Sequence, residues 1–222
     1  MNCKRCPVFA LVGVVAATAI AYAGQPPADD MQAITRVEHG LLTPVVIAGE
    51  PPHSTTLQSR MQHYHISAVS IAFFDASGIR WARAYGAATD TLFQAGSVSK
   101  SVSAVGIMRL VQEGRLNLDE NVNNVLRCWK VPDTPLTAKQ PVTLRELLSH
   151  TAGTTVHGFW GYERGKTLPT IDQVLDGSPP ANSAPIRVDL QPGAQYSYSG
   201  GGYLIAEKLL LDTVHQPFAA YM

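Results

Sequence analysis

The chain has 222 residues, of which 17 are Lys or Arg and 17 are Asp or Glu, so its formal charge is zero. That length is enough for one domain with a sizeable core, although charged residues, at 15%, fall below the roughly 25% usual in soluble domains. The balanced charge argues against a nucleic-acid partner, because phosphate binding requires a clustered basic face.

The N-terminal segment 1–23 has the three parts of a secretory signal peptide. Lys4 and Arg5 form a basic start, residues 7–20 are apolar, and Ala-Tyr-Ala at 21–23 offers a cleavage site between small residues. The apolar run is shorter than the about 20 residues that a membrane span needs. We therefore predict cleavage after Ala23, a periplasmic or secreted protein, and no stable membrane span after cleavage; an uncleaved anchor is the alternative.

The next part of the chain predicts a lead-in, a helix and a hairpin. Five prolines and mixed polar side chains predict an extended lead-in over 24–53. A helix is predicted over 55–65, with Ser54 as its N-cap. Two β-rich runs, 66–74 and 79–85, flank an Asp-Ala-Ser-Gly turn and predict an antiparallel hairpin.

Helical patterns follow the hairpin. Apolar residues at helical spacing predict a largely buried helix over 97–113. A short helical element is predicted over 116–126. A third helix is predicted over 143–149, because Thr143 and Glu146 match the spacing of a capping box.

Residues 151–195 are rich in Gly, Pro, Thr and Ser, which predicts a long loop with one short helix near 171–175. Loops of this length inside a domain often form lids or binding surfaces. A helix is predicted over 203–214 after three glycines, and Pro217 is typical of the first position of a further helix.

The pattern Ser97-x-x-Lys100 places a hydroxyl and an amine on one face of the helix that begins there. Serine needs an adjacent base to act as a nucleophile, and burial of a lysine disfavours its charged form. The helix N-terminus adds N–H groups and a positive potential near a developing oxyanion. The alternative is an ordinary N-cap serine followed by a solvated lysine.

A second chemical segment is rich in tyrosine, with Tyr196, Tyr198 and Tyr203 between Pro192 and the last helix. A tyrosine beside a cationic lysine loses its proton more easily and can serve as general acid or base. The alternative for each tyrosine is a packing residue whose hydroxyl is satisfied.

Taken together, these segments resemble, in order, the serine β-lactamase-related family of class C β-lactamases, D-Ala-D-Ala carboxypeptidases and β-lactamase-like esterases. The resemblance runs from about residue 55 to the end of the chain, and we take 54–222 as one domain of this family, its N-terminal part. The matching segments are the hairpin at 69–86, the nucleophile motif at 93–100, two structural signatures at 113–120 and 143–153, and the tyrosine motif at 192–203.

The resemblance implies roles for individual residues. Ser97 is the acylated nucleophile, Lys100 moves its proton, and Tyr198 is the catalytic tyrosine, with the Ser97 N–H as half of the oxyanion hole. His150 and Gly153 shape a turn. The chemistry needs no metal or organic cofactor, and we interpret the His-x-His at 63–65 as solvated or core histidines. The implied partner is a small molecule or a peptidoglycan peptide.

The implied fold is of the α/β (α+β) class, β-lactamase or penicillin-binding-protein-like, with a small antiparallel sheet and a helical subdomain. Two features depart from the family. The tyrosine motif reads Tyr198-Ser199-Gly200 where the family often has Tyr-Ser-Asn, and no Lys-Thr-Gly or His-x-Gly follows it. We therefore expect a truncated chain whose C-terminal strands are missing, with an unpaired sheet edge and an exposed apolar face.

The predicted function is a serine hydrolase that forms an acyl-enzyme on β-lactams, D-Ala-D-Ala peptides or small esters. One alternative is an inactive truncated remnant or a non-catalytic peptidoglycan-peptide binder. Another is a membrane-anchored interaction protein, which depends on an uncleaved apolar segment.

Overall fold

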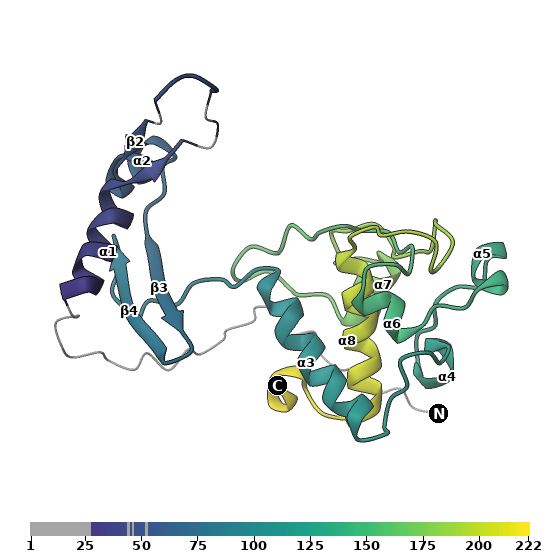
Figure 1. Ribbon diagram of the computed structural model, residues 1–222. Helices are drawn as coiled ribbons and strands as arrows, with labels where there is room; N and C mark the ends of the chain where they lie inside the picture. Colours follow the sequence, from purple (N-terminus) through teal and green to yellow (C-terminus); the bar gives the residue numbers. More distant parts are fainter. Residues whose placement is uncertain (1–27, 44, 46, 52) are drawn as a thin grey trace. The chain divides into compact units, whose positions relative to one another are not determined.

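The computed structural model describes residues 28–43, 45, 47–51 and 53–222 (Figure 1). They divide into two units with the boundary between Phe93 and Gln94, and each unit is described by itself. The boundary falls inside the domain predicted over 54–222. The predicted signal peptide and its cleavage site lie outside the described residues. In the described part of the chain, no helix has both the length and the apolar character to cross a bilayer.

The first unit contains two helices and two short antiparallel sheets. β1 pairs with β2, and β3 pairs with β4, in both cases antiparallel. In chain order the elements are α1 (Ala28–His39), β1 (Leu41–Leu42), β2 (Ser54–Thr55), α2 (Leu57–His63), β3 (Val69–Asp75) and β4 (Gly78–Tyr85).

Helix α1 contradicts the extended lead-in predicted over 24–53. The prolines that suggested it flank the helix, and none lies within Ala28–His39. The acidic side chains Asp29 and Asp30 lie in the first turn of α1, and Arg36 and His39 lie in the last. This arrangement complements the helix dipole. The distribution of charges therefore indicates a helix, although the proline-rich composition of the segment indicated an extended lead-in.

The predicted hairpin is confirmed as β3 and β4, with a register shift between Phe73 and Phe74. Asp75 stabilises the turn, because its Oδ1 accepts from the Ser77 N–H at 2.8 Å. Helix α1 is linked to β4, since Tyr85 donates its hydroxyl to Glu38 at 2.9 Å. The hairpin exposes apolar side chains, and Phe74 is 73% exposed.

The second unit is helical. Its elements are α3 (Val98–Gln112), α4 (Val122–Val125), α5 (Pro135–Lys139), α6 (Leu144–Leu148), α7 (Ile171–Asp176), α8 (Gly200–Val214) and α9 (Phe218–Tyr221). Helix α8 lies at its centre, packed against α3, α6 and α7 (Figure 1). The side chains that are almost fully buried include Ile107, Leu110, Leu144, Leu147, Leu175, Ile205, Leu209 and Leu210.

Helix α3 is less buried than predicted. Ile107 and Leu110 are in the core, whereas Val98, Val102 and Val105 are exposed, Val105 by 72%. The repeat of apolar residues predicts the helix correctly. The repeat does not identify the element that packs against each face of the helix. Among the described residues, none buries the face that carries Val98, Val102 and Val105.

Two shorter elements also differ from their predictions. Helix α4 is a single turn instead of 116–126, because Asn121 caps it by accepting from the Asn123 N–H at 2.9 Å. Helix α5 was not predicted, since the prolines around it indicated a loop. Pro135 in fact occupies its first turn, where proline is tolerated.

The predicted capping box of α6 is confirmed and supports a stability prediction. Thr143 N–H donates to Glu146 Oε2 at 2.8 Å, and Glu146 N–H donates to Thr143 Oγ1 at 3.3 Å. We expect Thr143→Ala to lower the free energy of unfolding by about 1 kcal/mol in urea denaturation. The exposed Thr167, changed to Ala in the same way, should stay within about 0.5 kcal/mol of wild type; equal losses in both variants would contradict the cap.

Candidate active site

The structure brings the three predicted site residues together. Ser97 is the N-cap residue of α3, and Lys100 lies one turn further on. Lys100 Nζ donates to Ser97 Oγ at 3.0 Å, and the hydroxyl of Tyr198 donates to the same oxygen at 2.7 Å. The Ser97 side chain makes no capping hydrogen bond. The alternative of an ordinary N-cap serine with a solvated lysine therefore does not fit the geometry.

The backbone before Ser97 explains the glycine in the motif. Gly96 has a φ of +52°, and a Cβ added there would meet no atom within 4 Å. Glycine is therefore favoured by backbone conformation, not by crowding. Among the described residues, no carbonyl accepts a hydrogen bond from the Ser97 N–H, so this group is available to an incoming oxyanion.

Close packing at the start of α8 explains the Tyr-Ser-Gly motif. Ser199 caps the helix by accepting from the Gly202 N–H at 2.9 Å. A Cβ at Gly200 would lie 3.2 Å from the His157 carbonyl oxygen and 3.2 Å from the Phe159 ring. An asparagine at position 200 would have to displace these neighbours, so the loop that begins at His157 accounts for the departure from Tyr-Ser-Asn.

Hydrogen bonds from Lys100 and with Ser97 lower the pKa of Tyr198 below its ordinary value. Lys100 Nζ also lies 5.1 Å from the centre of the Tyr198 ring and 5.8 Å from that of Tyr203. These distances are within the range of a cation–π interaction. The phenol of Tyr198 is thus held beside a cation that favours its ionised form.

His150 does more than shape a turn. Its ring centre lies 4.4 Å from that of Tyr198 and 5.1 Å from that of Tyr203, and its Nδ1 accepts from the Ser199 N–H at 3.1 Å. Burial, and then the charge of Lys100, lower the pKa of His150. A neutral His150 therefore supports the ring of Tyr198, whereas Tyr196 is largely exposed.

A cavity of about 800 Å³ opens at Ser97. Its walls come from α3, from the loop 157–169 and from α8. Sequence patterns did not predict that the aromatic residues of this loop, or Glu207 of α8, line the site. The lining includes Ser97, Lys100, Ser103, Ile107, His157, Phe159, Trp160, Tyr162, Glu163, Arg164, Lys166, Leu168, Val174, Tyr198, Tyr203, Leu204, Glu207 and Phe218.

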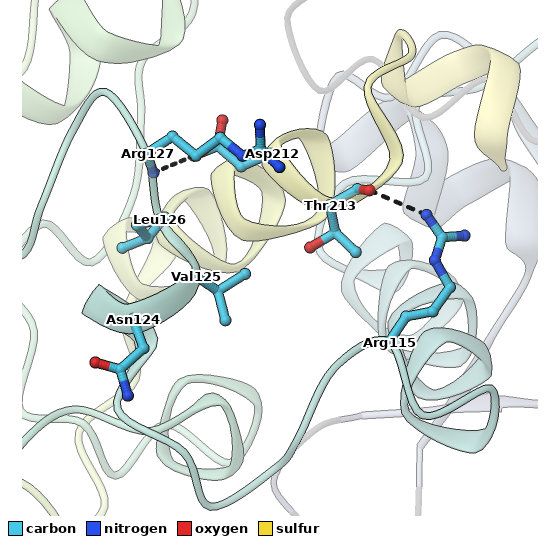
Figure 2. A pocket seen from close by; sticks show the side chains of 7 residues that line it. All are labelled: Arg115, Asn124, Val125, Leu126, Arg127, Asp212 and Thr213. Atoms are coloured by element: carbon cyan, nitrogen blue, oxygen red, sulfur yellow. Dashed lines mark hydrogen bonds between the residues drawn. The ribbon is translucent and has the colours of Figure 1, made fainter.

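A second cavity, of about 520 Å³, shares no lining residue with the first. Figure 2 shows the seven residues that line it. Apart from the exposed guanidinium of Arg127, its polar groups already have partners. Arg127 donates its backbone N–H to Asp212 Oδ2 at 2.9 Å, and Arg115 donates to the Thr213 carbonyl at 3.0 Å. This cavity therefore has no group prepared for chemistry.

In the part of the chain that the structure describes, no three His, Cys, Asp or Glu side chains are arranged to hold a metal ion. The two histidines at 63 and 65 are exposed at the end of α2.

The chain is similar to known proteins in sequence and in fold. The family model described as Beta-lactamase matches residues 54–222. The chain is 32% identical over 159 residues to Penicillin-binding protein 4 of Amycolatopsis lactamdurans, covering 68% of this chain and 39% of that protein. It is 38% identical over 88 residues to Esterase EstB of Burkholderia gladioli, covering 40% of this chain and 21% of the esterase.

A solved D-stereospecific amidohydrolase from Streptomyces sp. superposes with a TM-score of 0.52 at 24% identity, covering 69% of this chain and 46% of that one. This likeness confirms the predicted α+β, penicillin-binding-protein-like fold. The chain spans about two fifths or less of the length of both curated relatives. The family model extends over most of the chain, and the chain therefore belongs to the Beta-lactamase family.

Proposed function

We propose that this protein is a serine hydrolase that acts through an acyl-enzyme on Ser97. The substrate class is a β-lactam, a D-Ala-D-Ala peptide or a small ester. The observation that carries the proposal is the convergence of Tyr198 OH and Lys100 Nζ on Ser97 Oγ, at 2.7 and 3.0 Å. A nucleophile held by two proton-carrying groups is the arrangement that acyl transfer requires.

The proposed reaction has two stages. Ser97 Oγ attacks the substrate carbonyl carbon while its proton passes to ionised Tyr198, and the Ser97 N–H donates to the oxyanion. The bond to the leaving group then breaks, and the leaving group takes the proton from Tyr198. In the second stage water attacks the acyl ester, releases the acid and returns a proton to Ser97 Oγ. Lys100 stabilises ionised Tyr198 throughout.

Covalent labelling tests the proposal. The protein is incubated with a fluorescent penicillin or a fluorophosphonate, digested with trypsin and examined by mass spectrometry. We expect the adduct on the peptide 84–100, which contains Ser97 and Ser99. Ser97→Ala should abolish labelling and Ser99→Ala should retain it; labelling that survives Ser97→Ala would contradict the proposal.

The role of Lys100 predicts a pH effect. Because Lys100 lowers the pKa of Tyr198, Lys100→Met should move that pKa upward, towards 10. Deprotonation, and with it the basic activity of Tyr198, would then begin at higher pH. The measurement is the ultraviolet absorbance of tyrosinate as a function of pH. Subtracting the titration curve of the corresponding Tyr198→Phe variant isolates the contribution of Tyr198. Lys166→Met, at an exposed position on the same cavity, should leave the titration unchanged; an unshifted titration in Lys100→Met would contradict the role.

The proposal includes export of the protein to the periplasm or the medium through the leader 1–23. N-terminal sequencing of exported protein is expected to begin at Gly24, and a sequence beginning at Met1 would contradict cleavage.

A further inference from the structure

Glu207 is a buried acid for which the proposed reaction has no use. It lies in the middle of α8, is 6% exposed, and lines the cavity that also contains Ser97, Lys100 and Tyr198. Among the described residues, no donor or cation is bonded to its carboxyl group. A buried carboxyl group without a partner is costly, so its presence in a cavity wall calls for a ligand.

The position of Glu207 relative to the candidate nucleophile follows from helix geometry. Tyr203 and Glu207 are four residues apart on α8, so they share one face, separated by about 6 Å along the helix axis. On α3, Lys100, Ser103 and Ile107 share a face in the same way and line the same cavity. Helices α3 and α8 lie side by side (Figure 1). The cavity therefore runs from Ser97 along both helices to the carboxyl group.

The burial of Glu207 and the groups around it indicate which kind of ligand its carboxyl group can bind. Burial raises its pKa to about 7, with no contribution from a charged neighbour. The ionised form of this group is a carboxylate, which accepts hydrogen bonds only. The other titratable or charged groups on this cavity are Lys100, His157, Tyr162, Glu163, Arg164, Lys166, Tyr198 and Tyr203.

None of these groups neutralises Glu207. Lys100 donates to Ser97, and Lys166 lies 3.9 Å from Glu163 in an exposed ion pair. The remaining walls are mostly apolar and include Ile107, Val174 and Leu204. Such walls accommodate methylene groups, and a charge-assisted hydrogen bond to a carboxylate is stronger than a neutral one.

We propose that Glu207 recognises a primary ammonium group on the substrate, so that Ser97 acts preferentially on acyl groups that carry an amine on an aliphatic chain. This substrate preference specifies the substrate of the proposed hydrolase and rests on that proposed function. The binding of an alkylammonium ion by the cavity does not require turnover, so it is tested separately.

The test is isothermal titration calorimetry of the Ser97→Ala protein with n-butylammonium and with n-butanol, its neutral control. Above the pKa of Glu207 we expect n-butylammonium to bind at least about tenfold more tightly than n-butanol, a difference of about 1.4 kcal/mol. The added change Glu207→Gln, which keeps the shape of the side chain, should remove that preference. Asp189→Asn removes an exposed carboxylate that does not line the cavity and should leave the preference intact.

Proton release gives a second readout that needs no variant. Because a cation stabilises the carboxylate, binding should release protons in the pH range in which Glu207 titrates and almost none well above it. Titrations in buffers of different ionisation enthalpy measure the number of protons released on binding. They test whether Glu207 binds the cation even if Glu207→Gln fails to fold. Equal binding of n-butylammonium and n-butanol, or the absence of proton release over the pH range in which Glu207 titrates, would overturn the inference.

The substrate preference is measured on the active protein with p-nitrophenyl esters of an ω-amino acid and of the fatty acid of equal length. The ratio of their kcat/KM values should fall about tenfold in Glu207→Gln, and an unchanged ratio would overturn the preference. Ammonium binding without hydrolysis of either ester would contradict the proposed function and leave the cation site standing.

Discussion

Tyr198→Phe should lower kcat/KM for ester hydrolysis by about 10²–10⁴-fold, the usual contribution of a general acid or base. The change removes the hydroxyl that donates to Ser97 Oγ at 2.7 Å. It keeps the ring that packs on His150, with 4.4 Å between ring centres. The circular dichroism spectrum and the melting temperature should therefore stay close to those of wild type.

Tyr196→Phe is the matched control for this prediction. Tyr196 lies two residues away, is largely exposed, and has no hydrogen bond from its hydroxyl to any described residue. Its variant should retain the activity of wild type within about twofold. Equal activity of Tyr198→Phe and Tyr196→Phe would contradict the role of Tyr198.

Lys208→Met should destabilise the protein by about 3–5 kcal/mol near neutral pH, because it breaks a buried ion pair and leaves its acids without a cation. Lys208 is 6% exposed. Its Nζ lies 2.7 Å from Asp212 Oδ1 and 3.7 Å from Asp172 Oδ1. The contact with Asp212 lies within α8, and the contact with Asp172 joins α7 to α8. Urea denaturation measures the loss.

The loss should become smaller in acid. Burial raises the pKa of Asp172 above 3.8, and Lys208 opposes this rise, so the variant should have a still higher folded-state pKa. Between pH 3.8 and the raised pKa, Asp172 binds a proton in the folded protein and releases it in the unfolded chain. Stability of the variant therefore falls as pH rises through this window.

Lys139→Met is the control, because Lys139 is exposed and has no ion pair among the described residues. We expect a change within about 0.5 kcal/mol for this variant. A loss in Lys208→Met that does not shrink on acidification would contradict the role of Asp172.

Local patterns predicted most helices of the second unit and the hairpin of the first. The capping box at Thr143 and the run of apolar residues in α8 depend only on residues that are close together in the sequence. Such features can therefore be predicted from the sequence alone. Helix α1 was missed because the prolines around it dominate the composition of its segment. The exposure of Val105 was missed because a helical repeat does not identify what covers each face.

The candidate site divides in the same way. Ser97 and Lys100 are three residues apart and form a readable motif, and the family resemblance added Tyr198. Glu207 gave no signal, since a glutamate within a helix is ordinarily a solvated residue. Only the packing of α8 against α3 and the loop 157–169 shows that its carboxyl group faces a cavity.

The most direct test of the central claim is the hydrolysis of p-nitrophenyl acetate and nitrocefin by wild type, Ser97→Ala and Ser101→Ala. Ser101 is an exposed serine of the same helix, so its variant controls for the loss of a hydroxyl. We predict that Ser97→Ala lowers kcat/KM by about 10³-fold or more on at least one substrate, while Ser101→Ala retains the wild-type value. Hydrolysis by Ser97→Ala at the wild-type rate would contradict the account.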